Sequence, residues 1–159
     1  MDERMQNILI LISALGCGLI AGAFFAFSSF VMGALGKLPP SGGIAAMQSI
    51  NVVVINPIFL GVLFGTAALA LFLGFGAIRH LGDRRAILIV VGAGLYVIGT
   101  VMVTMAFNVP LNNALAAVDP ASDTGAAVWA DYLRTWTHWN RVRGLAALAA
   151  SGAFISALF

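Results

Sequence analysis

The sequence predicts an all-α integral membrane protein, a four-transmembrane-helix up-down bundle with a short interfacial or re-entrant helix between its first two spans. Composition is the first reason, since 61% of the 159 residues are hydrophobic, only 9% are charged and the mean hydropathy is +1.01. Soluble domains carry about 25% charged residues. Secondly, apolar runs of about 20 residues are long enough to cross a bilayer. Thirdly, the period-2 alternation of a membrane barrel is missing, and lipid cannot satisfy an open sheet edge.

Charge and cysteine content exclude several other classes. The net charge of +2 is too small to indicate a nucleic-acid partner, so the expected surroundings are the lipid bilayer. Cys17 is the single cysteine, which excludes an intrachain disulfide and a thiolate-rich metal site. We therefore predict no metal ligands. The N-terminal residues lack the pattern of a cleaved signal peptide, and we expect 7–35 to be a retained helix.

The first predicted helix, 7–35, and the short helix after it both carry packing signals. Small residues recur every four positions in the first helix, at Ala14, Gly18, Gly22 and Ala26. Such a stripe lets another helix approach closely, either from the same chain or from a second copy in a homo-oligomer. Prolines and glycines at 39–43 are expected to end this helix. The short helix, 44–51, places Gln48 and Asn51 on one face.

Two further spans are predicted at 57–78 and 86–107. The former starts with Asn56 as N-cap and Pro57 at the first helical position. The latter is expected to end before Pro110. Polar side chains spaced by four residues run along it, at Tyr96, Thr100, Thr104 and Asn108. They either form hydrogen bonds between helices or line a cavity.

The last predicted helix, 125–159, completes a single membrane domain over 1–159, with Ser122 or Asp123 as its cap. Four spans place both termini on one side of the membrane. The basic residues of that side lie in short flanks and a tight turn, at Arg4, Arg79, Arg84 and Arg85. By the positive-inside rule we expect an integral protein of a bacterial inner membrane with both termini cytoplasmic.

Polar and aromatic residues concentrate in 129–143, which reads WADYLRTWTHWNRVR. On a helical wheel one arc of about 100° combines aromatic rings with an amide and a cation. This arc holds Trp129, Tyr132, Trp136, Trp139, Asn140 and Arg143. The opposite face is charged and holds Asp131, Arg134, His138 and Arg141.

The aromatic arc has two interpretations. It can be an interfacial belt, where Trp and Tyr prefer to lie. It can instead close a pocket with polar residues of the other helices, namely Gln48, Asn51, Asn108 and Asn112. Arg143 favours the pocket, because it lies about one turn deeper than Trp139 and a charge at that depth usually faces the bundle interior. Asn140 and Arg143 are therefore the leading catalytic candidates.

His138 has the chemistry of a general base but projects from the charged face of a regular helix. We keep it as a catalytic candidate beside Asn108, Asn140 and Arg143. It can equally be a solvated surface residue or a single axial ligand of haem. The sequence assigns no cofactor, since haem on His138 is one alternative and cofactor-free chemistry is another.

Four short blocks carry a family resemblance. They are AGAFFAFSSFVMGAL (21–35), AAMQSIN (45–51) followed by Asn56 and Pro57, FNVPLNNAL (107–115), and the pattern W-x2-Y-x3-W-x2-WN-x2-R over 129–143. In this order they resemble the anthrone oxygenase-like family of small four-helix integral membrane proteins. The family pattern often has His directly after the Trp–Asn pair, where this chain has Arg141.

The resemblance implies a membrane oxidoreductase, an oxygenase that oxidises a lipophilic aromatic substrate with O₂ in a pocket at one membrane face. Trp136 and Trp139 would then stack on the substrate, and Phe27 and Tyr132 would extend the aromatic wall. Donors for an oxyanion would come from Gln48, Asn108, Asn112 or Asn140. Arg143 would stabilise the negative charge. Two other classes stay open: a non-catalytic membrane module that binds a lipid, quinone, haem or partner, and a small homo-oligomeric transporter.

Overall fold

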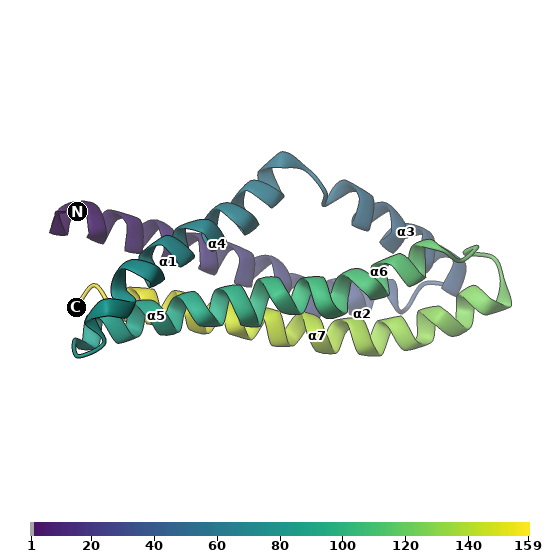
Figure 1. The fold of residues 1–159 in the computed structure, drawn as a ribbon. Helices are drawn as coiled ribbons and strands as arrows, with labels where there is room; N and C mark the ends of the chain where they lie inside the picture. The colour runs from purple at the N-terminus through teal and green to yellow at the C-terminus, as the bar shows by residue number, and fades with distance from the viewer. Residues whose placement is uncertain (1) are drawn as a thin grey trace.

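The described part of the chain, residues 2–159 of a computed structural model, folds into helices and short turns without a strand (Figure 1). The all-α class is therefore confirmed. In chain order the elements are α1 (Glu3–Ala26), the π-helical segment η1 (Phe27–Val31), α2 (Met32–Leu35), α3 (Pro40–Val53), α4 (Pro57–Ala77), the 3₁₀ turn η2 (Ile78–His80), α5 (Arg84–Tyr96), the π-helical segments η3 (Val97–Met102) and η4 (Thr104–Asn108), α6 (Val109–Ala116) and α7 (Asp123–Ser156).

Three continuous helices are long and apolar enough to cross a membrane. They are Glu3–Leu35, which joins α1, η1 and α2, Pro57–His80, and Arg84–Ala116, which joins α5, η3, η4 and α6. Four such helices had been predicted, and the described residues, 2–159, contain three. α7 has the length, at 34 residues, but Asn140, Arg141 and Arg143 interrupt its apolar half.

α7 packs against α1 and α5, and α4 packs against α5 and α1. Both termini and the turn between α4 and α5 lie at one end of the molecule, while α3 and the turn between α6 and α7 lie at the other (Figure 1). The elbow between α3 and α4 stands apart from the other helices, with Val52, Ile55 and Ile58 exposed (Figure 1). The start of α4 therefore lies away from the ends of the other helices (Figure 1).

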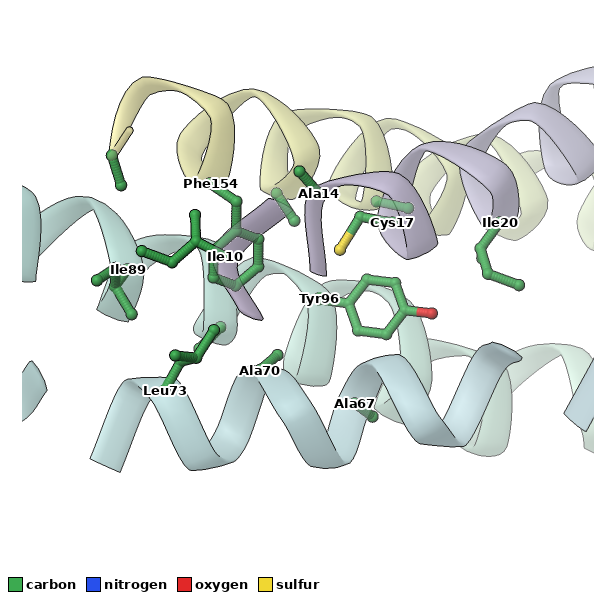
Figure 2. Packing of buried hydrophobic residues seen from close by; sticks show 14 of the residues in the cluster. Ile10, Ala14, Cys17, Ile20, Ala67, Ala70, Leu73, Ile89, Tyr96 and Phe154 are labelled. Atoms are coloured by element: carbon green, nitrogen blue, oxygen red, sulfur yellow. The ribbon is translucent and has the colours of Figure 1, made fainter. Parts of the chain in front are cut away.

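Two hydrophobic clusters fill the interior. The first joins α1, α4, α5 and α7 toward the termini, as Figure 2 shows. Its members include Ile10, Cys17, Ala70, Tyr96 and Phe154. The second cluster lies beneath α3, and its members include Met32, Met47, Leu115, Trp129 and Trp136. The two clusters leave room for a polar layer between them along α7.

α3 begins at Pro40, earlier than the predicted short helix at 44–51. Pro40 occupies the first turn, where its missing N–H would have no helical partner. Gly43 lies inside α3 rather than ending a helix. A Cβ on Gly43 would lie 2.7 Å from Cζ2 of Trp129, so the glycine allows the close contact that seats α3 on α7.

Both predicted helix caps are present. Oδ1 of Asn56 accepts hydrogen bonds from the backbone N–H groups of Ile58 and Phe59 at 3.1 and 3.0 Å. Oγ of Ser122 accepts from the N–H of Gly125 at 2.9 Å, so Ser122 rather than Asp123 caps α7. These local signals fix where α4 and α7 begin.

The helix predicted to end before Pro110 instead continues through it to Ala116. A proline inside an α-helix removes a hydrogen bond and clashes with the carbonyl four residues earlier. Here the preceding turn is π-helical, and the N–H of Val109 donates to the carbonyl of Thr104, five residues back. The wider turn therefore admits the proline without ending the helix.

Candidate functional site

Polar side chains from three elements meet between the two hydrophobic clusters. We call this set the inner polar cluster, and its members are Ser28, Thr104, Asn108, Asn140 and Arg143. Along α7 it lies between Trp136 of the second hydrophobic cluster and Ala147 of the first. The apolar residues on both sides lower the local dielectric constant and so strengthen any electrostatic contact made there.

The inner polar cluster is built on π-helical backbone. Ser28 belongs to η1, Thr104 and Asn108 belong to η4, and both segments pack against α7 together with η3. Well under 1% of residues in globular proteins are π-helical, and π turns inside α-helices occur frequently at functional sites. Their convergence on one part of α7 marks this region as the candidate site.

Arg143 is the cation of the cluster, and only 6% of the residue is exposed. Its Nε and Nη2 donate to Oδ1 of Asn140 at 3.1 and 2.8 Å, and its Nη1 donates to Oγ1 of Thr104 at 3.2 Å. Its Cζ lies 3.9 Å from the centroid of the Phe24 ring and 5.1 Å from that of Trp136. All of these partners are neutral.

No acidic side chain forms an ion pair with Arg143 within residues 2–159. All six acidic residues are exposed, and the ion pairs that they form are with Arg85 and Arg134. Moving a charge into a protein interior costs several kcal/mol, while a desolvated cation–π contact returns about 2 kcal/mol. Arg143 therefore retains uncompensated positive charge, and an anion would be stabilised beside it.

Asn140 connects α7 to the first helix. Its Nδ2 donates to the Phe24 carbonyl at 2.7 Å and to Oγ of Ser28 at 2.6 Å, while its Oδ1 accepts from Arg143. Both amide hydrogens are thus used inside the fold. Asn140 orients Arg143. The sequence had suggested that its amide would donate to an oxyanion, but in this structure both amide hydrogens are already engaged.

Asn108 and Trp136 present unpaired polar atoms in the interior. Nδ2 of Asn108 donates to the Trp136 carbonyl at 3.2 Å. Oδ1 of Asn108 and Nε1 of Trp136 are buried without a hydrogen-bond partner in residues 2–159. Leaving a buried polar group unpaired costs about 1–3 kcal/mol. Asn108 therefore offers a hydrogen-bond acceptor and Trp136 a donor. The prediction from sequence was that Asn108 would donate and that Trp136 would only stack.

The remaining predicted polar residues form a separate set near α3, which we call the outer polar cluster: Gln48, Asn51, Asn112 and Tyr132. The Tyr132 hydroxyl donates to Oδ1 of Asn112 at 2.8 Å and accepts from Nδ2 of Asn51 at 3.5 Å. Gln48 donates to the backbone carbonyls of Leu115 and Val118 and so fixes the end of α6.

The predicted single pocket is thus divided between two clusters, with a row of rings connecting them. Along α7, Tyr132 stacks on Trp129 at 5.7 Å and on Trp136 at 5.8 Å between ring centroids. The Phe27 ring lies 5.9 Å from Trp136 and completes this wall. Trp139 is not part of the row, because its ring stacks on Phe107 with centroids 3.6 Å apart.

His138 lies outside both clusters. It is exposed, and its ring meets the edge of Trp139 with centroids 5.3 Å apart. The structure therefore places this candidate base on the charged outer face of α7, together with Asp131 and Arg134. In contrast, five of the six residues in the aromatic arc are buried, as the helical wheel predicted.

An open groove lies against the inner polar cluster, between the first helix and α7. It has a volume of about 530 Å³. Its lining is almost entirely apolar, apart from Ser28, Ser29, Asn140 and Arg141. Three glycines, Gly18, Gly22 and Gly144, belong to the lining, and a Cβ on Gly22 would meet no atom within 4 Å. Phe24 and Ser28 were not among the predicted site residues, and Thr104 was predicted only as one of the polar residues along 86–107.

These features define the class: an all-helical protein with three helices able to cross a membrane and a buried, unneutralised cation at a polar layer. A family model described as "Anthrone oxygenase" matches residues 58–153, more than half of the chain. The chain belongs to the anthrone oxygenase family. The match contains α4 to α7 with Asn108, Asn140 and Arg143, whereas the blocks at 21–35 and 45–51 lie before it. No curated protein and no solved structure matches the chain.

Proposed function

We propose that the protein is a membrane oxidoreductase of the anthrone oxygenase type, which oxidises a lipophilic aromatic substrate with O₂ beside the inner polar cluster. The observation that carries this proposal is the uncompensated charge of buried Arg143. An anthrone becomes an enolate on losing its benzylic proton. A buried cation without a carboxylate partner stabilises an oxygen-centred anion of this kind, and membership of the family supports the substrate class.

The chemistry needs charge stabilisation and an apolar surrounding. By stabilising the enolate, Arg143 lowers the pKa of the substrate's benzylic C–H, so that the proton leaves to water. The enolate then transfers an electron to O₂, and the resulting radical and superoxide combine to form a carbon–oxygen bond. Loss of water from this hydroperoxide gives the anthraquinone. One O₂ is consumed and one water is released for each anthrone, so no external reductant is required.

The residues around Arg143 have distinct parts in this proposal. Asn140 and Thr104 hold the guanidinium in place through neutral hydrogen bonds, which leave its charge available. The Trp136 indole N–H is a further donor for the substrate oxygen, and Oδ1 of Asn108 accepts from a substrate hydroxyl. Removing one donor to a developing oxyanion lowers the rate by about 10²–10³.

The test is O₂ consumption by the purified protein with anthrone, for Arg143→Met and its matched control Arg134→Met. Arg134 lies on the same helix but is exposed, and its ion pair with Asp131 is at the surface. We expect Arg143→Met to lose about 100-fold or more in kcat/KM and Arg134→Met to retain wild-type activity. Equal activity of the two variants, or no anthrone oxidation by the wild type, would refute the proposed function.

For the orientation we propose that both termini face the cytoplasm in a bacterial inner membrane. The support is the position of Arg4, Arg79, Arg84 and Arg85, which lie on short flanks and a tight turn at the same end as the termini (Figure 1). Positive residues in such short segments remain on the cytoplasmic side. The outer polar cluster, which contacts α3, then lies nearer the opposite face.

A further inference from the structure

The groove between α1 and α7 opens at the surface of a helix that can itself cross a membrane. Its rim is formed by Phe25, Leu145 and Leu148, which are 69, 67 and 59% exposed. A volume of about 530 Å³ falls in the range of small-molecule sites, about 300–1,000 Å³. An occupant of this groove therefore enters from the lipid and has an apolar body.

Ser28 gives the groove a free hydrogen-bond donor. A serine inside a helix usually donates to the carbonyl four residues earlier, as Ser29 does to Phe25 at 2.7 Å. For Ser28 that carbonyl belongs to Phe24, and Nδ2 of Asn140 already donates to it. The Ser28 oxygen accepts from Asn140, and among the described residues its hydroxyl hydrogen has no acceptor. It is therefore available to a molecule in the groove.

The charge of the inner polar cluster lies one contact away from the groove. Phe24 and Asn140 line the groove, and both contact the guanidinium of Arg143. An occupant with an oxygen at the Ser28 end would gain a hydrogen bond together with the field of the buried cation. A plain acyl chain would gain neither.

We propose that this groove binds the ring body of a planar aromatic substrate taken directly from the lipid, with a phenolic or enolic oxygen of the substrate accepting from Ser28. The inference rests on the proposed function for the substrate class and adds the binding position, the entry side and a specificity residue. Gly22 leaves open space in the lining, where a Cβ would meet no atom within 4 Å, and this space can take a ring.

Filling the groove tests the position. A Cβ on Gly22 would meet no atom within 4 Å, so Gly22→Leu adds a side chain to the groove without a clash in the fold. Gly65→Leu on α4 is the matched control, since its Cβ also meets nothing and it lies outside the groove. The measurement is the saturable binding of anthrone to the protein in nanodiscs, in the absence of O₂. The uptake of anthrone by empty nanodiscs is subtracted. Gly22→Leu should bind at least about tenfold more weakly than wild type, and Gly65→Leu should bind equally well.

Removing the hydroxyl tests the polar contact. Ser28→Ala should weaken anthrone binding about three- to tenfold, the effect of one neutral hydrogen bond. Ser49→Ala is the control, because Ser49 is an exposed helical serine of α3 outside the groove. Equal affinities of Ser28→Ala and Ser49→Ala would overturn the assignment of Ser28.

Binding and oxidation separate this inference from the proposed function. If wild type oxidises anthrone but Gly22→Leu and Gly65→Leu bind it equally, the groove assignment fails and the proposed function stands. If anthrone binds in a Gly22-dependent manner but is never oxidised, the groove stands and the proposed function fails. If the groove instead seats a second copy of the chain, Gly22→Leu will change the mass of the particle by light scattering and leave anthrone binding unchanged, which also overturns the inference.

Discussion

The amide of Asn140 is fully used, because its two hydrogens and its oxygen make four hydrogen bonds to two helices. An asparagine side chain has two donor hydrogens and two lone pairs on its oxygen. Its orientation is consequently fixed, with the hydrogens toward Phe24 and Ser28 and the oxygen toward Arg143. This single residue couples the backbone of the first helix to the position of the cation.

We expect Asn140→Ala to lose stability and activity together. The change removes the hydrogen bonds that hold Arg143 and leaves part of a buried guanidinium unpaired, which should lower the free energy of unfolding by about 2 kcal/mol. Unfolding by SDS titration in detergent measures it, with Asn113→Ala as control because Asn113 is exposed. If both variants unfold at the wild-type SDS concentration, Asn140 does not have this structural part.

At this scale the sequence predicted the inward face of α7 and missed the contacts across helices. Trp136, Asn140 and Arg143 follow helical spacing, so a wheel was sufficient to place them on one buried face. Ser28 and Thr104 lie on other helices. The spacing of residues within one helix does not determine how that helix is aligned along another. The division of the polar residues into inner and outer clusters depended on that register. So did the stacking of Trp139 on Phe107, which removes Trp139 from the row of rings.

At the scale of the element, π-helical turns determine where the site lies. In η1 and η4 the backbone accommodates one residue more than an α-helix would, which turns Ser28, Thr104 and Asn108 toward α7. No residue pattern in 27–31 distinguished this turn from regular helix in the sequence. Likewise, Gly43 suggested the end of a helix, although its lack of a side chain serves the contact with Trp129.

Deleting Ser29 from η1 should separate fold from function. Removing one residue converts the wide turn into regular α-helix while the flanking helices keep their phase. Helical content by circular dichroism should be retained, while anthrone oxidation falls about tenfold or more because Phe27 and Ser28 are displaced. Deleting Leu15 from regular α1 is the control, since it rotates the rest of that helix by about 100° and should abolish folding. Wild-type activity after the Ser29 deletion would show that η1 has no functional part.

At the scale of the whole molecule, the two ends differ in kind. The end with both termini and the turn between α4 and α5 carries Arg79, Arg84 and Arg85, the outer polar cluster contacts α3 at the other end, and the inner polar cluster lies between the two hydrophobic clusters (Figure 1). The all-helical class and the position of the helices followed from hydropathy and caps. The prediction of a fourth membrane-spanning helix was wrong, because α7 mixes apolar residues with the polar residues of the site.

The proposed orientation predicts opposite labelling of two engineered cysteines. In a Cys17→Ala background, His80→Cys lies at the α4–α5 end and Thr124→Cys at the start of α7, and both positions are exposed. A membrane-impermeant maleimide should label His80→Cys in inside-out vesicles and Thr124→Cys in right-side-out vesicles. Labelling of both from the same side would contradict the crossing of the membrane by Arg84–Ala116, which separates the two positions, and the reversed result would contradict the orientation alone.

The covered polar face of α7 also bears on how the chain is assembled. Burying a charge away from water costs several kcal/mol until its partners are in place, and α7 adds the buried amide of Asn140 to that cost. The helices that contact this face, α1, η1, η3 and η4, all precede α7 along the chain. Synthesis therefore delivers the hydrogen-bond acceptors and the aromatic ring of Phe24 before the cation that needs them. The final helix completes a site whose partners are already in place.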